Sequence, residues 1–451
     1  MLKGRTTTGL CQVYAVMAVE NTAQKLARKI TKRPVIGLAI VVLCICYIVF
    51  VSCPSYKYKY IEYSHLTNVP EEIEPVIFDS ITFQKLSHLG NVRKERKPAV
   101  GVSFNALLKE YSNKIRDLKL GGQWMNNQVI PCEEESKAGK ACVEPSCPVR
   151  PSTTLEENLR SVLSTMSEQN LRDLDLIMGV FPEPYTGKRT MFVTATSSNH
   201  FYESQALIRN LHRNVFPLIN NYTFVLYDLG LAVSEREQME KYCRCEVRSF
   251  PLEFMPSRLK NLQCYTWKPI IIQANLHKTD ILVWMDASVR FSNNIIKPLL
   301  DDVEIQGLVI ASGTNSVGQH TLQVTMNYMK EDVCTLAPVY EHEATFIMFH
   351  NEQWVREAVV KPWAACAMTA KCMCPRDPEQ DKFCDVNIHK YHKCHRFDQS
   401  GINIILAKLF RDHTSSFISP FYDYVSLERG DSYRYFDELE ELHALLASRR
   451  P

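Results

Sequence analysis

Short apolar runs alternate with segments of helical periodicity from about residue 188 onward. Six runs have the length and composition of strands, and they lie at residues 191–196, 222–227, 245–250, 281–285, 307–311 and 344–349. Between the first two, Leu207, Leu211 and Val215 recur every four positions and form one face of a helix. Strands that alternate with helices predict an α/β domain, with a mixed, mostly parallel sheet flanked by helices.

Four further segments have helical periodicity. They cover residues 154–178, 235–242, 267–274 and 398–410, and we expect the first to be one helix that packs onto the sheet domain. The sequence contains neither a GxGxxG motif nor a P-loop motif. It therefore supports neither a standard dinucleotide-binding fold nor a P-loop nucleotide site.

The apolar run Ile281–Met285 ends abruptly at Asp286, which is followed by Ala287 and Ser288. Ligands of open α/β sheets gather at the carboxyl ends of the strands. Asp286 is therefore a candidate for contact with a metal ion or a sugar nucleotide, and Asp228, after the run at 222–227, is a second candidate. The alternative is ordinary turn chemistry, because Asp is favoured where a strand turns into a loop.

An uncharged apolar run covers residues 35–53. As a helix it would span roughly 28 Å, close to the thickness of the hydrocarbon layer, and is too long for the core of a signal peptide. More basic residues precede the run than follow it, which predicts a cytosolic N-terminus. We expect a type II single-pass protein anchored in the lipid bilayer through residues 35–53, with a lumenal or extracellular C-terminal part.

The cysteines agree with this topology. Twelve of the 16 cysteines follow the apolar run and its edge, and an even set in an oxidising compartment predicts disulfides. A sequon at Asn221 is a candidate glycosylation site. The net charge of +2 gives no reason to expect nucleic-acid binding. The predicted division is 1–33 cytosolic tail, 34–53 signal anchor, 54–185 lumenal stem, 186–415 sheet domain and 416–451 C-terminal extension.

Several segments together resemble an uncharacterised family of nematode single-pass membrane proteins. They are Phe192–Thr196, Asn199–His200, Tyr265–Pro269, Val283–Ala287 and Phe397–Ser400. The lumenal domain of that family looks like a distant relative of the glycosyltransferase-A fold. The resemblance covers about half of the chain and implies a fold more firmly than a function.

The resemblance also implies roles for single residues. Asp286 is similar to the first acid of the Asp-x-Asp element that holds Mn²⁺ or Mg²⁺ and the donor in such enzymes, and Asp398 and Gln399 are similar to acidic positions near the acceptor. The second acid of the element is replaced by Ser288, a weak ligand for a hard cation. Either a second ligand comes from elsewhere, or the fold works without metal, or it no longer catalyses.

Each candidate has a structural alternative. Asp398 is a candidate general base, but an Asp before a helix is also a favoured N-cap. Lys268, at a predicted helix start, is a candidate for diphosphate contact, with a surface lysine as the alternative. Gln399 is a candidate substrate contact or a residue that only fills the first turn.

A cluster of cysteines and histidines lies between Cys366 and His395. It contains enough ligands for zinc, but its spacing is not that of a standard zinc motif, and lumenal cysteines usually pair, so a disulfide-linked loop is favoured. His395 is a candidate to complete a metal site with Asp286. The tight pairs Cys243/Cys245 and Cys372/Cys374 are expected to bond to distant partners rather than within each pair.

Together these features favour a glycosyltransferase of a Golgi or other secretory-pathway membrane. It would transfer a sugar from a nucleotide-sugar to a glycan or protein acceptor, with Asp286 on the donor side and Asp398 on the acceptor side. The alternative is a non-catalytic, disulfide-stabilised ectodomain that binds a partner or a glycan. Ser288 favours that alternative.

Overall fold

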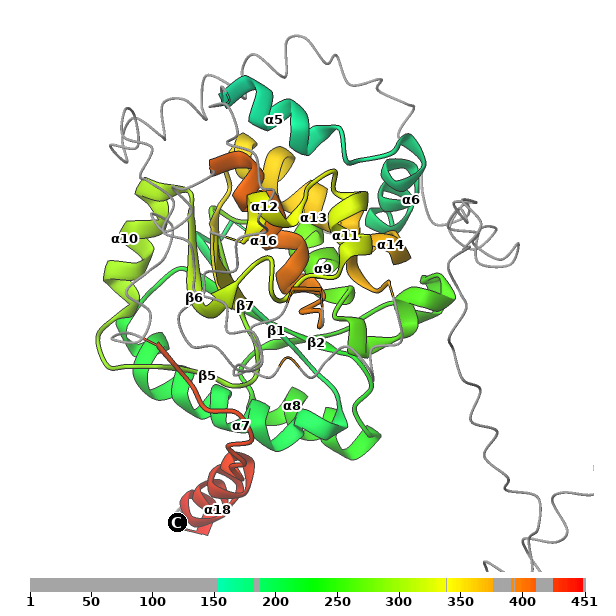
Figure 1. Cartoon of the computed structure of the whole chain (residues 1–451). Helices are drawn as coiled ribbons and strands as arrows, with labels where there is room; N and C mark the ends of the chain where they lie inside the picture. Colours follow the sequence, from blue (N-terminus) through cyan, green and yellow to red (C-terminus); the bar gives the residue numbers. More distant parts are fainter. Residues whose placement is uncertain are drawn as a thin grey trace, which may run out of the picture. The chain divides into compact units, whose positions relative to one another are not determined.

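The computed structural model describes residues 155–181, 187–337, 339–375, 394–410 and 425–448, together with single positions at 153, 384, 391 and 392. Its centre is a six-stranded sheet with the order β3-β2-β1-β4-β7-β6 (Figure 1). The strands are β1 (Thr190–Thr196), β2 (Tyr222–Asp228), β3 (Glu246–Ser249), β4 (Ile281–Met285), β6 (Leu308–Ser316) and β7 (Tyr340–His350).

The sheet is mixed and mostly parallel. Strand β1 pairs in parallel with β2 on one side and with β4 on the other, and β2 pairs in parallel with β3. Strand β7 alone runs in the opposite direction to the other five strands, because it pairs antiparallel with both β4 and β6. This confirms the predicted mixed sheet, and all six predicted strands are present.

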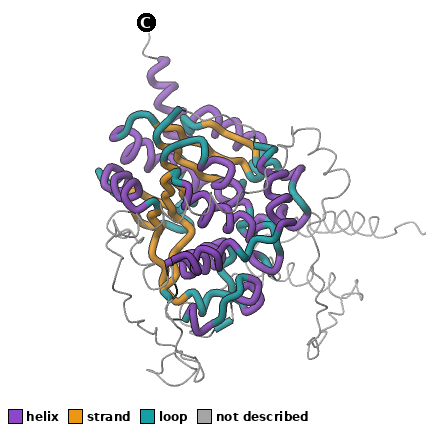
Figure 2. The backbone as a smooth tube through the Cα atoms, turned by 90° about the horizontal axis from the view of Figure 1, so that it is seen from above, coloured by secondary structure: helices purple, strands orange, loops and turns teal. Residues whose placement is uncertain are grey.

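Each face of the sheet has its own apolar core. Along β1, Met191, Val193 and Ala195 point into one core and Phe192 into the other, as the period of two in a strand requires. Figure 2 shows the strands between helices on both sides. The helices that contribute to the first core are α5 (Leu155–Leu163), α6 (Glu168–Met178), α9 (Trp267–Leu276), α11 (Gln323–Tyr328), α12 (Val333–Leu336), α13 (Lys361–Ala367), α14 (Ala370–Met373) and α16 (Asp398–Phe410).

The second core is covered by fewer helices and by the end of the chain. The helices are α7 (Phe201–Asn210), α8 (Val233–Tyr242), α10 (Ile296–Gln306) and α18 (Tyr435–Ser448). Strand β8 (Val425–Leu427) pairs antiparallel with β5 (Val289–Phe291) in a small ribbon, and α18 follows beside α7 (Figure 1). Residues 425–448 thus pack on the sheet domain; the predicted domain boundaries themselves stay predictions.

The prediction of one helix over residues 154–178 is wrong. The chain forms two helices, α5 and α6, separated at residues 164–167. Ser167 ends the gap as the N-cap of α6, and its side chain accepts a hydrogen bond from the Asn170 amide at 3.1 Å. An N-cap serine offers a helix start that the apolar spacing alone does not reveal.

Four disulfides join described cysteines: Cys243–Cys245, Cys264–Cys374, Cys366–Cys372 and Cys384–Cys394. The prediction for Cys243 and Cys245 is wrong, since they bond to each other. Cys374 bonds to the distant Cys264, as expected, whereas Cys372 bonds to Cys366, six residues away. All five cysteines of the segment 366–394 are in disulfides, which favours the disulfide-linked loop over zinc ligation.

The predicted anchor at 35–53 and residues 54–152 of the predicted stem lie outside the described residues. Among the residues that the structure describes, no helix is long and apolar enough to cross a membrane. The membrane topology therefore stays a prediction. Asn221, the predicted glycosylation site, is exposed at the start of β2 with a φ of 58°.

Candidate functional site at the carboxyl edge of the sheet

The order of the strands defines where a ligand would bind. The chain moves outward from β1 to β2 and β3, and then crosses to β4 on the other side of β1. Such a reversal between neighbouring parallel strands is a topological switch point, and ligands bind beyond the carboxyl ends of the strands there. In this chain that edge is formed by residues 197–200 after β1 and by Asp286 after β4.

A buried lysine joins two carboxylates at this edge. The Lys268 ammonium lies 3.1 Å from a carboxylate oxygen of Asp286 and 2.6 Å from one of Asp398, and donates to the Ala344 carbonyl at 3.0 Å. Lys268 belongs to the first turn of α9, and Asp398 is the first residue of α16. The structure thus brings together the three predicted residues that were expected on the donor and acceptor sides.

The charges of the three groups depend on one another. Burial alone would lower the pKa of Lys268, but the nearby Asp286 and Asp398 raise it above its usual range, so the amine stays protonated. Burial raises the pKa of Asp398, while the Lys268 ammonium opposes that shift. A buried ammonium without these carboxylates would be strongly unfavourable. The alternative that Lys268 is a surface lysine is wrong.

Asp286 is the member of the trio that reaches solvent. Its side chain is 27% exposed, whereas those of Lys268 and Asp398 are buried. The indole of Trp284 donates to its carboxylate at 2.8 Å, and its backbone amide donates to the Thr345 carbonyl of β7 at 2.8 Å. These contacts hold the carboxylate at the strand exit with one side open to a ligand.

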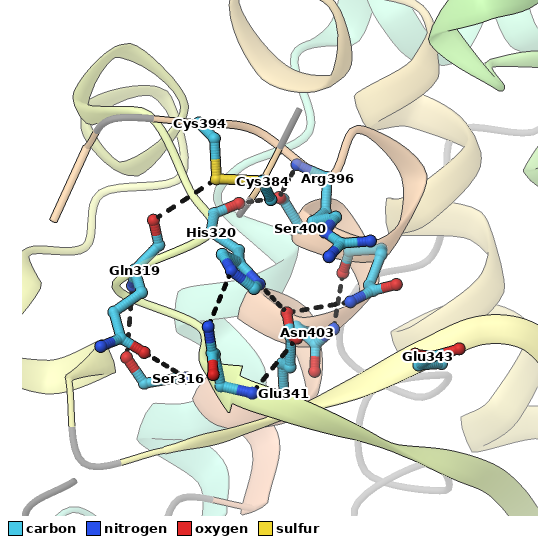
Figure 3. A network of polar contacts seen from close by, with 12 residues as sticks. Ser316, Gln319, His320, Glu341, Glu343, Cys384, Cys394, Arg396, Ser400 and Asn403 are labelled. Carbon is cyan, nitrogen blue, oxygen red and sulfur yellow. Dashed lines mark hydrogen bonds and ion pairs between the residues drawn. A yellow bond between two sulfur atoms is a disulfide. The ribbon is translucent and has the colours of Figure 1, made fainter. Parts of the chain in front are cut away.

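A second buried network positions the start of α16 (Figure 3). Glu341 of β7 accepts a hydrogen bond from Gln399 at 2.9 Å and lies 2.8 Å from His320 Nδ1. Ser400 donates to the His320 carbonyl at 2.7 Å, and Asn403 exchanges hydrogen bonds with the backbone of β7. Because all these groups are buried and satisfied, they fix the helix turn that carries Asp398.

The charge of Glu341 is stabilised inside this network. Burial would raise the pKa of its carboxyl group, but hydrogen bonds from His320 and Gln399 and the charge of Arg396 lower the pKa below its usual value. Gln399, a predicted substrate contact, therefore has its amide engaged with Glu341. Its role toward a substrate stays a prediction.

The loop after β1 and the C-terminal segment 425–431 meet at the same edge. His200 Nδ1 lies 2.7 Å from Glu203, and Glu203 also accepts the Gly430 amide at 3.0 Å. The hydrogen bond to Glu203 raises the pKa of His200, and the charge of Asp286 raises it further. His200 thus lies within electrostatic reach of Asp286.

Tyr265 marks the outer side of the trio. It adopts a left-handed conformation with a φ of 53°, and its ring lies 5.7 Å from the Lys268 ammonium. Burial raises the pKa of Tyr265; Asp398 and Asp286 add to the shift, and Lys268 and Arg429 oppose it. Tyr265 is only partly buried, with 41% of its surface exposed, and an aromatic ring beside the trio is suited to stack on a sugar or a base.

The other predicted site residues lie elsewhere or are engaged. Asp228 accepts the amides of Gly230 and Leu231 at 2.8 and 2.7 Å and pairs with Arg236 at 2.8 Å. It thus closes its own turn, and nucleotide contact stays a prediction. His395 is buried, with Nε2 3.1 Å from the Met373 carbonyl.

The carboxylate of Asp286 is already engaged by the Lys268 ammonium and the Trp284 indole, which any divalent cation at this position would have to displace. Among the described residues, the group of three ligand atoms close enough to hold a metal is His320, Cys384 and Cys394, which includes neither Asp286 nor His395. That group is itself unsuited, because the cysteines form a disulfide and both His320 nitrogens have polar partners. The side chain of Ser288, where a second acid would be expected, is buried.

Two residues at the edge were not predicted from the sequence. Glu343 of β7 accepts hydrogen bonds from Thr345 at 3.2 Å and from Arg429 at 3.3 Å, and burial raises the pKa of its carboxyl group. The sequence signal for Glu343 was its position directly before the predicted strand at 344–349. No sequence pattern indicated Arg429, because the segment that contains it lies far from Asp286 in the sequence.

Comparison with known proteins gives one family match. The profile of a family described as "Protein of unknown function (DUF1647)" matches residues 163–273. This range contains β1 to β3 and Lys268, and ends before Asp286. No curated protein matches the chain.

Solved structures of glycosyltransferases share a distant likeness with the chain. The WbbM bifunctional glycosyltransferase has 13% identity and a TM-score of 0.31, covering 52% of this chain and 39% of that protein. The galactosyltransferase LgtC, in complex with donor and acceptor sugar analogues, has 14% identity and a TM-score of 0.28, covering 49% and 70%. Core-mannan synthase A from Aspergillus fumigatus, in a Mn/GDP form, has 10% identity and a TM-score of 0.31, covering 54% and 78%.

Proposed function

We propose that the domain transfers a sugar from a nucleotide-sugar to a glycan or protein acceptor. The observation that carries the proposal is the Asp286–Lys268–Asp398 trio at the switch point of the sheet. A doubly wound sheet places its ligand at this edge. A turn after a strand needs only one Asp side chain, whereas here three charged side chains are held together by buried contacts.

The trio suits the chemistry of glycosyl transfer. An acceptor hydroxyl would attack the anomeric carbon as the bond from that carbon to the diphosphate oxygen breaks, and the nucleoside diphosphate would leave. Asp286, partly exposed, is the proposed hydrogen-bond acceptor for a donor hydroxyl group. Asp398, expected as the base, is buried against Lys268, so its proposed role is to hold Lys268 and Asp286 in position. The hydroxyl proton would pass to water at the exposed side of Asp286.

The setting of this reaction is also a proposal. The apolar run at 35–53 and the disulfides support a type II protein of the Golgi or another secretory-pathway membrane. Asn221, exposed at the start of β2, is the proposed glycosylation site.

A non-catalytic ectodomain is the second candidate. It is favoured by Ser288 at the position of the second acid and by the engagement of Asp228 and Gln399 in the fold. Such a domain would bind a glycan or a protein without a nucleotide. The two candidates differ in whether a nucleotide binds.

The test is a titration of the purified full chain with UDP, GDP and their sugars, following thermal unfolding. A ligand present at 100 times its dissociation constant stabilises the folded state by about 2.7 kcal/mol. The proposal predicts a saturable rise in the unfolding temperature with one nucleotide class, and hydrolysis or transfer of the matching sugar. No shift with any nucleotide would remove the transferase and leave the binding domain.

A further inference from the structure

The C-terminal segment reaches the position where the expected second acid is missing. In the β5–β8 ribbon Val289 lies opposite Leu427, and the next pairing bond runs from the Glu428 amide to the Ser288 carbonyl at 2.8 Å. Arg429 is the next residue of the chain. The fold thus places a cationic residue next to the partner of Ser288, although the two positions are 141 apart in the sequence (429 − 288).

The Arg429 side chain is placed to meet a ligand. It is 58% exposed and has Glu343 as its ion-pair partner, with a separation of 3.3 Å. Glu343 is hydrogen-bonded to Thr345, whose carbonyl accepts the Asp286 amide. Arg429 also acts electrostatically on Tyr265 together with the three members of the trio. These contacts connect Arg429, through Glu343 and Thr345, to the backbone of Asp286.

The donor of the proposed reaction carries a diphosphate, which needs positive charge nearby. A divalent cation at Asp286 would compete with the Lys268 ammonium and the Trp284 indole for the carboxylate, and position 288 offers a buried serine in place of a second acid. The Lys268 ammonium is buried and already occupied by Asp286, Asp398 and a carbonyl. Arg429 has the planar, multidentate donor group that suits phosphate oxygens.

We infer that Arg429 binds the diphosphate of the nucleotide-sugar directly, without a divalent cation between the enzyme and the phosphates. The inference rests on the proposed function and deepens it. The Lys268 ammonium keeps Asp286 and Asp398 in place from inside the protein, and Arg429 supplies charge from outside. On binding, the guanidinium exchanges the Glu343 carboxylate for phosphate oxygens.

The experiment measures the dissociation constants of UDP and GDP for the full chain by calorimetry, once with EDTA and once with Mn²⁺. Arg429→Ala is compared with Arg434→Ala, a matched control in the same segment whose exposed side chain pairs with Asp437. We expect equal affinity in both buffers and a loss of about tenfold or more in Arg429→Ala, the size of one charge-assisted hydrogen bond. Arg434→Ala should change the affinity less than about twofold, as a surface pair does.

Mn²⁺ binding is followed separately by electron paramagnetic resonance without nucleotide. The wild type should bind no Mn²⁺ stoichiometrically. Nucleotide binding that requires Mn²⁺, or an equal loss in both arginine variants, would overturn the inference and leave the transferase intact. Absence of nucleotide binding in both buffers would overturn the proposed function and the inference together.

Discussion

Lys268 and Lys408 are both buried in this domain, and they differ in what surrounds them. Lys408 pairs with Glu331 at 3.0 Å and donates to the Met329 carbonyl at 2.9 Å, with side-chain exposures of 0% for the lysine and 3% for the acid. Lys268 also binds a carbonyl, but it has two carboxylates, and one of them, on Asp286, reaches solvent. We call Lys408 and Glu331 the closed pair, because neither side chain reaches solvent. We call Lys268, Asp286 and Asp398 the open site, because Asp286 does reach solvent.

Both sites include helix α16, which makes the comparison sharper. Asp398 begins the helix and Lys408 lies in its last turn, so each charge has the sign that the helix dipole favours at that end. The helix is thus anchored at both ends by buried charge pairs. Only its first end faces the switch point of the sheet, so only that end combines buried charge with access for a ligand.

The largest expected effect is on the closed pair. Lys408→Met leaves the Glu331 carboxylate buried without its ammonium, and should lower the free energy of unfolding by about 3–5 kcal/mol. The folded fraction should keep its affinity for nucleotide. Urea unfolding and nucleotide calorimetry measure the two quantities. A double variant that also carries Glu331→Met should recover most of the stability, because replacing both partners by apolar groups removes the unpaired charge.

Removal of the lysine from the open site should affect both stability and nucleotide binding. Lys268→Met should lower the free energy of unfolding by about 3 kcal/mol at neutral pH, since Asp286 can be hydrated but Asp398 cannot. It should also abolish nucleotide binding. The matched control is Lys361→Ala, whose lysine forms a surface pair with Glu357, and it should cost about 0–1 kcal/mol.

The free energy of unfolding of Lys268→Met, measured as a function of pH, tests how the ionisation of Asp398 affects stability. Burial holds the pKa of Asp398 above its ordinary 3.8, so its contribution to stability is present below that pH and is lost as the pH rises through the raised value. Removal of the ammonium should raise the pKa further. The stability deficit of the variant should therefore be small near pH 4 and grow toward pH 7; a deficit independent of pH would contradict the role of Asp398.

The smallest effect concerns His200 and Glu203, beside the open site. Glu203 raises the pKa of His200 above 6.5, while hydrogen bonds from His200 and Gly430 overcome burial and lower the pKa of Glu203 below 4.5. Their pairing should stabilise most between about pH 4.5 and 6.5, weaken as the pH rises through the His200 value and weaken as it falls through the Glu203 value. In an NMR titration, Glu203→Gln should lower the pKa of His200. An unchanged pKa of His200 would contradict the pairing of the two residues.

Much of the fold follows from local patterns in the sequence. Strand β4 could be predicted because a buried strand in a parallel region is continuously apolar, and all five of its residues are buried. The break between α5 and α6 was missed because Ser167 acts through a cap and not through apolar spacing. The disulfide between Cys243 and Cys245 was missed because two cysteines separated by a single residue were expected to pair with distant cysteines.

The candidate site was only partly predictable. Asp286 could be placed at a strand exit from its own neighbourhood, since the apolar run ends there. The burial of Lys268 depends on Asp398, 130 residues away by their numbering, and the position of Arg429 depends on the pairing of β5 with β8. Such contacts are fixed by tertiary packing, and helical periodicity cannot tell a buried lysine from an exposed one.

The central claim is that the edge carrying Asp286, Lys268 and Asp398 is where a nucleotide-sugar binds. The most direct measurement is the dissociation constant of the nucleotide that stabilises the wild type, compared between Asp286→Ala and Glu304→Gln. Glu304 is a matched carboxylate on α10 that pairs with Arg189 at the surface. The account predicts at least about a tenfold loss in Asp286→Ala and none in Glu304→Gln; equal affinity in the two variants would contradict it.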